Sequence, residues 1–116
     1  MTLTARDYLI NRFTEDARAL HERVSTMRRG TKVPGPDAAT SERMADACED
    51  VIDLLEEIGT DGEEEPDTAT LAAALVPQLE ARMKQHQAQA AVRSVYAGAI
   101  ARLREVEEAE RRDESR

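Results

Sequence analysis

Few side chains in this sequence could bind a transition metal: two histidines, His21 and His86, and one cysteine, Cys48. A di-iron site in a helical bundle requires a glutamate three residues before a histidine. That position is Arg18 for His21. For His86 it is Met83, so neither histidine fits the motif. Three scattered ligands are also too few for a typical zinc site, and we expect no metal and no other cofactor.

Nucleophilic catalysis has equally little support in the sequence. Cys48 stands beside the apolar positions of a predicted helix, where a cysteine usually packs as a small hydrophobic residue. The chain has no Gly-x-Ser-x-Gly elbow, and its five glycines are too scattered to form a phosphate-binding loop. We expect that the protein is not an enzyme, and a helical protein that binds a small ligand remains an alternative. A single cysteine allows no intrachain disulfide, so nothing indicates an oxidising compartment.

A short acidic run superficially resembles a calcium-binding loop. Four acidic residues alternate as the first ligands of such a loop do: Asp61, Glu63, Glu65 and Asp67. The loop also needs a glycine where this chain has Pro66 and a bidentate glutamate where it has Ala72. Both requirements fail, and we interpret the run as a solvated charged connection between helices.

The net charge of −8 is concentrated in the middle of the chain. Residues 34–70 hold thirteen acidic side chains and one basic side chain, whereas the segments on either side are close to neutral. Six of the acidic residues share one predicted helix: Asp46, Glu49, Asp50, Asp53, Glu56 and Glu57. Opposite charges on neighbouring helices would explain this distribution within the bundle. Alternatively, the six residues form an acidic face that binds a basic protein or mimics nucleic acid.

Arginines gather on the first predicted helix: Arg6, Arg12, Arg18, Arg23, Arg28 and Arg29. Acidic residues are interleaved with them, and the isoelectric point near 4.8 is far from that of a typical nucleic-acid-binding domain. We therefore expect no nucleic acid as a partner. The fourteen arginines against two lysines are typical of a GC-rich genome and suggest a bacterial source.

Hydrophobic periodicity defines the first two helices. Apolar residues recur every three or four positions from Ile10 to Met27, which predicts a helix with one buried stripe. Thr2 or Thr4 would cap this helix, and Gly30 would end it. After a loop with two prolines and a glycine, a second apolar stripe predicts another helix, capped by an aspartate or threonine in residues 37–40.

That second stripe comprises Met44, Ala47, Val51, Leu54 and Ile58. Gly59 would end the helix, and a charged connection follows. Asp67 or Thr68 would cap the next helix, in which Pro77 produces a kink or a break. Residues 78–112 contain only one helix-disfavouring residue, Gly98, so local propensity favours a single long helix.

The apolar residues of that last segment fall on two opposite faces. The first face holds Leu79, Met83, His86 and Ala90. The second holds Val92, Tyr96, Ala99, Leu103 and Val106. Either the chain reverses between Lys84 and Gln89 to give a fourth helix, or one long helix exposes its second stripe to a partner. We favour the long helix, with the second stripe forming a homodimer interface.

The sequence therefore predicts an all-α fold: a small antiparallel bundle of three long helices, the last kinked at Pro77, or of four helices. Residues 1–112 would form one domain and residues 113–116 a frayed, charged tail. No apolar run is long enough to span a membrane, and the N-terminus lacks the features of a signal peptide, so we expect a cytoplasmic protein. The main functional hypothesis is a protein-interaction or oligomerisation module.

Overall fold

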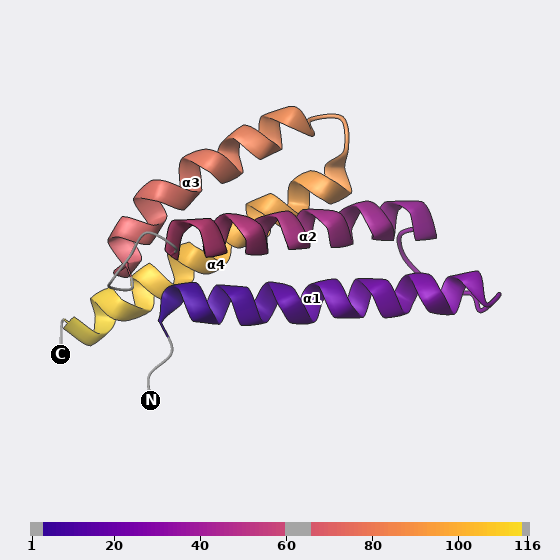
Figure 1. Ribbon diagram of the computed structural model, residues 1–116, viewed down its shortest axis with the longest axis horizontal. Helices are drawn as coiled ribbons and strands as arrows, with labels where there is room; N and C mark the ends of the chain where they lie inside the picture. Colours follow the sequence, from indigo (N-terminus) through magenta and orange to yellow (C-terminus); the bar gives the residue numbers. More distant parts are fainter. Residues whose placement is uncertain (1–3, 60–65, 115–116) are drawn as a thin grey trace.

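The computed structural model describes residues 4–59 and 66–114, and four α-helices account for most of them (Figure 1). The helices are α1 (Ala5–Arg28), α2 (Ala38–Gly59), α3 (Thr68–Gln85) and α4 (Ala90–Glu114). Successive helices run in alternating directions, and these two described ranges contain no strand. The all-α prediction is confirmed, and of the two predicted arrangements the protein adopts the bundle of four helices.

Helix α1 begins and ends where the sequence predicts. The Thr4 hydroxyl accepts a hydrogen bond from the backbone N–H of Asp7 at 3.1 Å, which satisfies one of the free donors of the first turn. Leu9 and Phe13 belong to the buried stripe that follows. At the other end, Gly30 has a φ of +94°, a backbone conformation that ends helices and favours glycine.

The connection between α1 and α2 is held by one arginine side chain. The Arg23 guanidinium donates hydrogen bonds to the carbonyl oxygens of Pro34 at 2.6 Å and Pro36 at 2.8 Å. Gly35 lies between these prolines with a φ of +106°, and a Cβ there would lie 3.0 Å from the guanidinium. Asp37 then caps α2 by accepting a backbone N–H bond from the first turn at 2.7 Å.

Helix α3 continues through its proline. Asp67 caps it, accepting a hydrogen bond from the backbone N–H of Thr70 at 2.8 Å. Pro77 lies inside the helix on an exposed position. Since proline has no N–H, the carbonyl of Ala73 loses its usual helical donor, but the helix extends a further eight residues to Gln85.

The prediction of one long C-terminal helix is wrong. The chain leaves helical geometry at His86, whose carbonyl accepts the N–H of Gln89 at 2.9 Å, and α4 starts at Ala90. The Arg93 side chain donates to the carbonyl of Gln87 at 2.7 Å and holds the turn. This turn lets both apolar faces of the segment point into one core, and that burial outweighs the local preference for a continuous helix.

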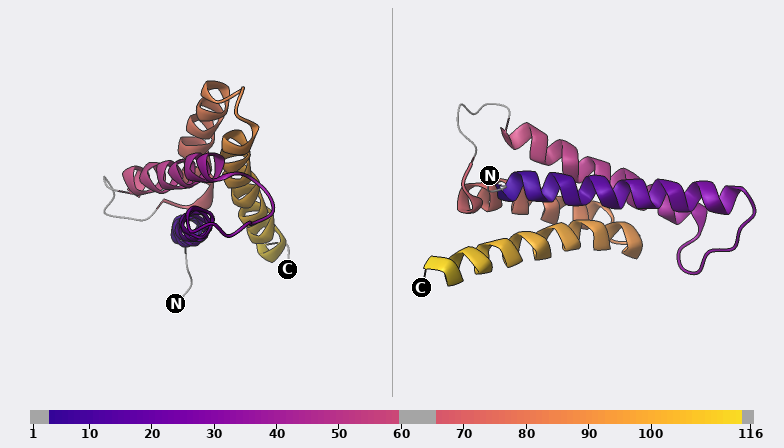
Figure 2. Two further views of the ribbon diagram at one scale, coloured as in Figure 1. Left: turned by 90° about the vertical axis from the view of Figure 1, so that its right-hand side faces the viewer. Right: turned by 90° about the horizontal axis from the view of Figure 1, so that it is seen from below.

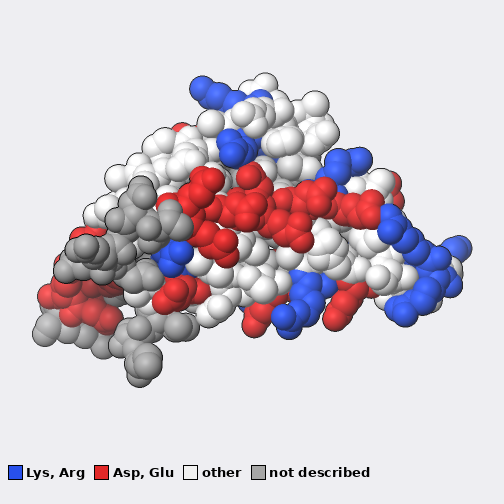
Figure 3. Space-filling view, viewed as in Figure 1, with Lys and Arg blue, Asp and Glu red and all other residues white. Residues whose placement is uncertain are grey.

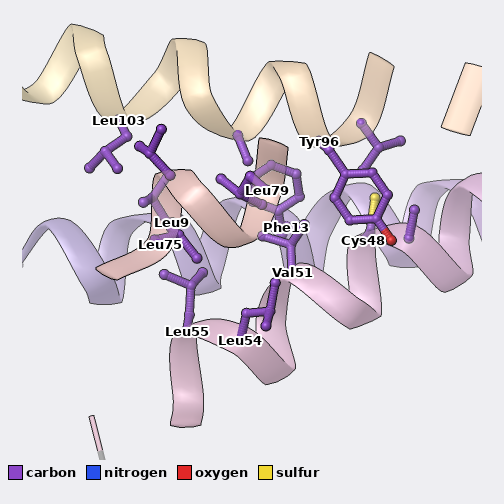
Figure 4. Close-up of a cluster of buried hydrophobic side chains, with 14 of the residues drawn as sticks. Leu9, Phe13, Cys48, Val51, Leu54, Leu55, Leu75, Leu79, Tyr96 and Leu103 are labelled. Carbon is purple, nitrogen blue, oxygen red and sulfur yellow. The ribbon is translucent and has the colours of Figure 1, made fainter. Parts of the chain in front are cut away.

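The bundle consists of two hairpins. Helix α1 packs mainly against α2, and α3 mainly against α4, while α2 also contacts α4 (Figures 1 and 2). The core lies between the hairpins and draws side chains from all four helices, among them Leu9, Leu55, Leu75 and Leu103 (Figure 4). Helices α1 and α4 contact each other much less than the helices within each hairpin do.

The predictions for the charged connection and for the two ends of the chain fall partly outside the described residues. Helix α4 continues to Glu114, so two residues of the expected frayed tail, Asp113 and Glu114, are helical. Residues 60–65 and 115–116 lie outside the described residues, and with them most of the predicted charged connection and of the calcium-like run. Thr2, the other candidate cap of α1, lies outside them as well.

Candidate interaction surface

The apolar stripe predicted as a homodimer interface is part of the core. Four of its members are buried against other helices of the same chain: Val92, Tyr96, Ala99 and Leu103. The fifth, Val106, is half-buried and packs against that core. The expectation that this stripe is exposed is therefore wrong, because the turn before α4 folds it back onto α2 and α3.

The acidic residues of α2 do form an exposed face. Five of the six predicted members are exposed: Asp46, Glu49, Asp53, Glu56 and Glu57. We call these five residues the acidic stripe. From Asp46 to Glu56 they recur at steps of three or four positions, and Glu57 lies four positions after Asp53, so all five follow one side of the helix, opposite the residues that α2 buries. In Figure 3, acidic side chains form a red band along the middle of the molecule, where α2 lies in the same view of Figure 1.

The arginines of α1 neutralise only a small part of α2. Arg28 pairs with Glu42 near the start of the helix, beyond the stripe. Arg6 directs its guanidinium to two backbone carbonyls at the C-terminal end of α2, those of Leu55 at 2.7 Å and Glu56 at 3.4 Å. The prediction that opposite charges pair within the bundle is therefore fulfilled in part, by Arg28 with Glu42 and by Arg82 of α3 with Asp50.

Within the stripe itself, ion pairing is sparse. The imidazole of His21 lies 3.0 Å from a carboxylate oxygen of Glu49, and both side chains are about half exposed. Across residues 4–59 and 66–114, no ion pair involves Asp46, Asp53 or Glu56. Three carboxylates on one face of a rigid helix are thus left without a cationic partner in the described part of the chain.

Asp50, the sixth predicted member, belongs to a different cluster. Its Oδ2 atom accepts two hydrogen bonds, one from the Tyr96 hydroxyl at 2.8 Å and one from Arg82 Nε at 2.9 Å. The ring of His86 stacks on that of Tyr96, with centroids 5.9 Å apart. The cluster therefore links α2 to α3, to α4 and to the turn between them.

The electrostatics of this cluster are those of a structural contact. Burial and the hydrogen bond to Asp50 raise the pKa of Tyr96, and the bond to Asp50 also raises the pKa of Arg82. Both groups are thus held in the protonated state that donates to the carboxylate. No local pattern in the sequence indicates this cluster, because Asp50 and Tyr96 are far apart in the chain and meet only after α4 folds back.

The residues considered for metal and nucleophilic chemistry lie apart from one another. His21 is exposed beside Glu49, His86 stacks on Tyr96, and Cys48 is buried in the core. Burial raises the pKa of the Cys48 thiol to about 12, so the thiol stays protonated and unreactive at neutral pH. In the two described ranges, no group of three or more potential ligands is placed to hold a metal ion.

The fold and this surface define a four-helix protein with an acidic face on its second helix. No protein-family model matches the chain, and neither a curated protein nor a solved structure is significantly similar to it. None of the helices in the described part is both long and apolar enough to cross a membrane. A function for this chain has to be argued from its own residues.

Proposed function

We propose that this chain is a protein-interaction module whose acidic stripe binds a basic protein partner. The observation that carries the proposal is the exposure of Asp46, Asp53 and Glu56 without ion pairs among the described residues. The module acts by binding alone and performs no catalysis. Its carboxylates lie on open surface, where water screens them and no enclosed site concentrates their charge.

The stripe is well placed to bind a helix. Helix α2 contacts all three other helices, so its backbone is fixed before a partner arrives. Carboxylates at steps of three and four positions match arginines or lysines spaced in the same way on a partner helix. Long-range attraction would speed association and weaken as salt is added.

A direct test uses a synthetic amphipathic peptide with an arginine at every third or fourth position, labelled for fluorescence anisotropy. One variant removes three charges from the stripe: Asp46→Asn, Asp53→Asn and Glu56→Gln. The matched control removes three charges from exposed positions of α1, α3 and α4: Glu15→Gln, Glu80→Gln and Glu105→Gln. The two variants have the same net charge, so any difference in their affinity for the peptide reports where on the surface the charges were removed.

We expect the stripe variant to bind the peptide roughly tenfold more weakly than the wild type, taking about 0.5 kcal/mol for each exposed ion pair. The control should bind within about twofold of the wild type at the same salt concentration. Equal weakening in both variants would show that only net charge matters and would overturn the proposal. Once a natural partner is found, its release by duplex DNA would assign the stripe to nucleic-acid mimicry.

A further inference from the structure

A second surface, distinct from the acidic stripe, lies between α1 and α4. These two helices run side by side when the molecule is seen from below (Figure 2) but contact each other little. Between them is an open groove of about 370 Å³. Its floor is apolar and includes Phe13, Leu20, Met44, Cys48 and Val95. The bundle thus leaves a hydrophobic groove between two helices that none of the described residues fills.

The walls of the groove would admit a helix at close range. Ala19 lines the wall on α1, and Ser94 and Gly98 line the wall on α4. A Cβ added at Gly98 would meet no atom within 4 Å, so nothing in the described chain requires a glycine there. Glycine inside a helix costs about 1 kcal/mol relative to alanine, and its benefit is the close approach of another backbone.

The charges on the two walls indicate what kind of helix fits. Asp16 lies on the α1 wall and Arg102 on the α4 wall. Asp16 has only a long contact of 3.7 Å to Arg12 on its own helix, and Arg102 forms no ion pair with any described residue. One acid and one base on opposite walls make the groove complementary to itself under a two-fold rotation.

We propose that a second copy of this chain packs over the groove, with its α4 against α1 of the first copy, and forms a two-fold symmetric dimer. Asp16 of each copy then faces the partner's Arg102, and the small residues of α4 let the helices approach closely over the apolar floor. This interface differs from the buried stripe of α4 that the sequence predicted as a dimer contact. It also leaves the acidic stripe exposed, so the two surfaces can be tested separately.

The first experiment measures mass by native mass spectrometry and by light scattering over a roughly tenfold dilution. Gly98→Leu fills the groove from a position with free space, and Ala81→Leu adds the same side chain to an exposed position of α3 as the matched control. We expect a dimer for the wild type and the control, and a monomer of unchanged helicity for Gly98→Leu. A monomeric wild type, or a dimer that persists in Gly98→Leu, would overturn the proposal.

A charge swap then tests the symmetry of the dimer. Asp16→Arg and Arg102→Asp should each weaken dimerisation by roughly tenfold or more, because each places like charges together twice in the interface. The double variant should restore the affinity of the wild type, since the pair is re-formed with its signs exchanged. Loss of affinity in the double variant equal to the sum of the single losses would refute the two-fold arrangement.

Discussion

The buried thiol of Cys48 should make this fold sensitive to alkaline pH. The side chain is 2 % exposed, and burial, reinforced by the negative charges of Asp16 and Glu49, raises its pKa from about 9 to about 12. In the unfolded chain the thiol ionises at the lower pKa. The protonated thiol therefore stabilises the folded state fully below about pH 9, and this stabilisation is lost as the pH rises toward 12.

The size of the effect follows from the two pKa values. At about pH 10 the unfolded thiol is mostly ionised and the folded thiol is not, which reduces the free energy of unfolding by about 1.4 kcal/mol. At about pH 8 the same calculation gives roughly 0.1 kcal/mol or less. The variant Cys48→Ala has no thiol to ionise. Its free energy of unfolding should therefore fall about 1.3 kcal/mol less than that of the wild type over this interval.

Guanidinium denaturation followed by circular dichroism, with reductant present, measures both proteins at each pH. Cys48→Ala will itself be less stable at neutral pH by about 1 kcal/mol, because the substitution leaves a small cavity. For that reason the quantity to compare is the change with pH, not the absolute stability. Parallel curves for the two proteins would refute the reasoning and show that the thiol is open to water in the folded state.

Two further predictions concern the contacts that hold the hairpins together. Tyr96→Phe keeps the buried ring but removes the hydroxyl donor to Asp50, and should lower the free energy of unfolding by about 1 kcal/mol in urea denaturation, since Arg82 still binds the carboxylate. A variant as stable as the wild type would show that this bond contributes nothing. Leu55→Ala removes a fully buried side chain and should cost about 2–5 kcal/mol with a single cooperative transition; a loss below about 1 kcal/mol would contradict the packing described for α2.

The beginnings of the first three helices could be predicted from the sequence because the signals are local. Thr4, Asp37 and Asp67 each cap a helix through a hydrogen bond to a backbone N–H three residues away. The end of α1 at Gly30 depends on one residue's conformational freedom. Such interactions require no knowledge of the remaining chain, and all four positions were among those expected.

The reversal between α3 and α4 could not be predicted in the same way. The segment from His86 to Gln89 contains neither glycine nor proline, so no local signal competes with the helix. The break follows from the core, which buries Leu79 of α3 and Leu103 of α4 together. A helix that continues past His86 cannot bring the apolar stripe of α4 into the core, so the stripe is assigned to a partner. It also cannot bring Tyr96 to Asp50, so their hydrogen bond is not foreseen.

The placement of charge on α2 also argues that the acidic stripe has a role beyond folding. Its carboxylates are neighbours at three and four positions, an arrangement that destabilises a helix by about 0.2–0.5 kcal/mol for each like-charged pair. A cationic partner would relieve this repulsion. If the groove between α1 and α4 holds a second copy, each dimer presents two such stripes, and a partner with two basic segments would bind far more tightly than either stripe alone allows.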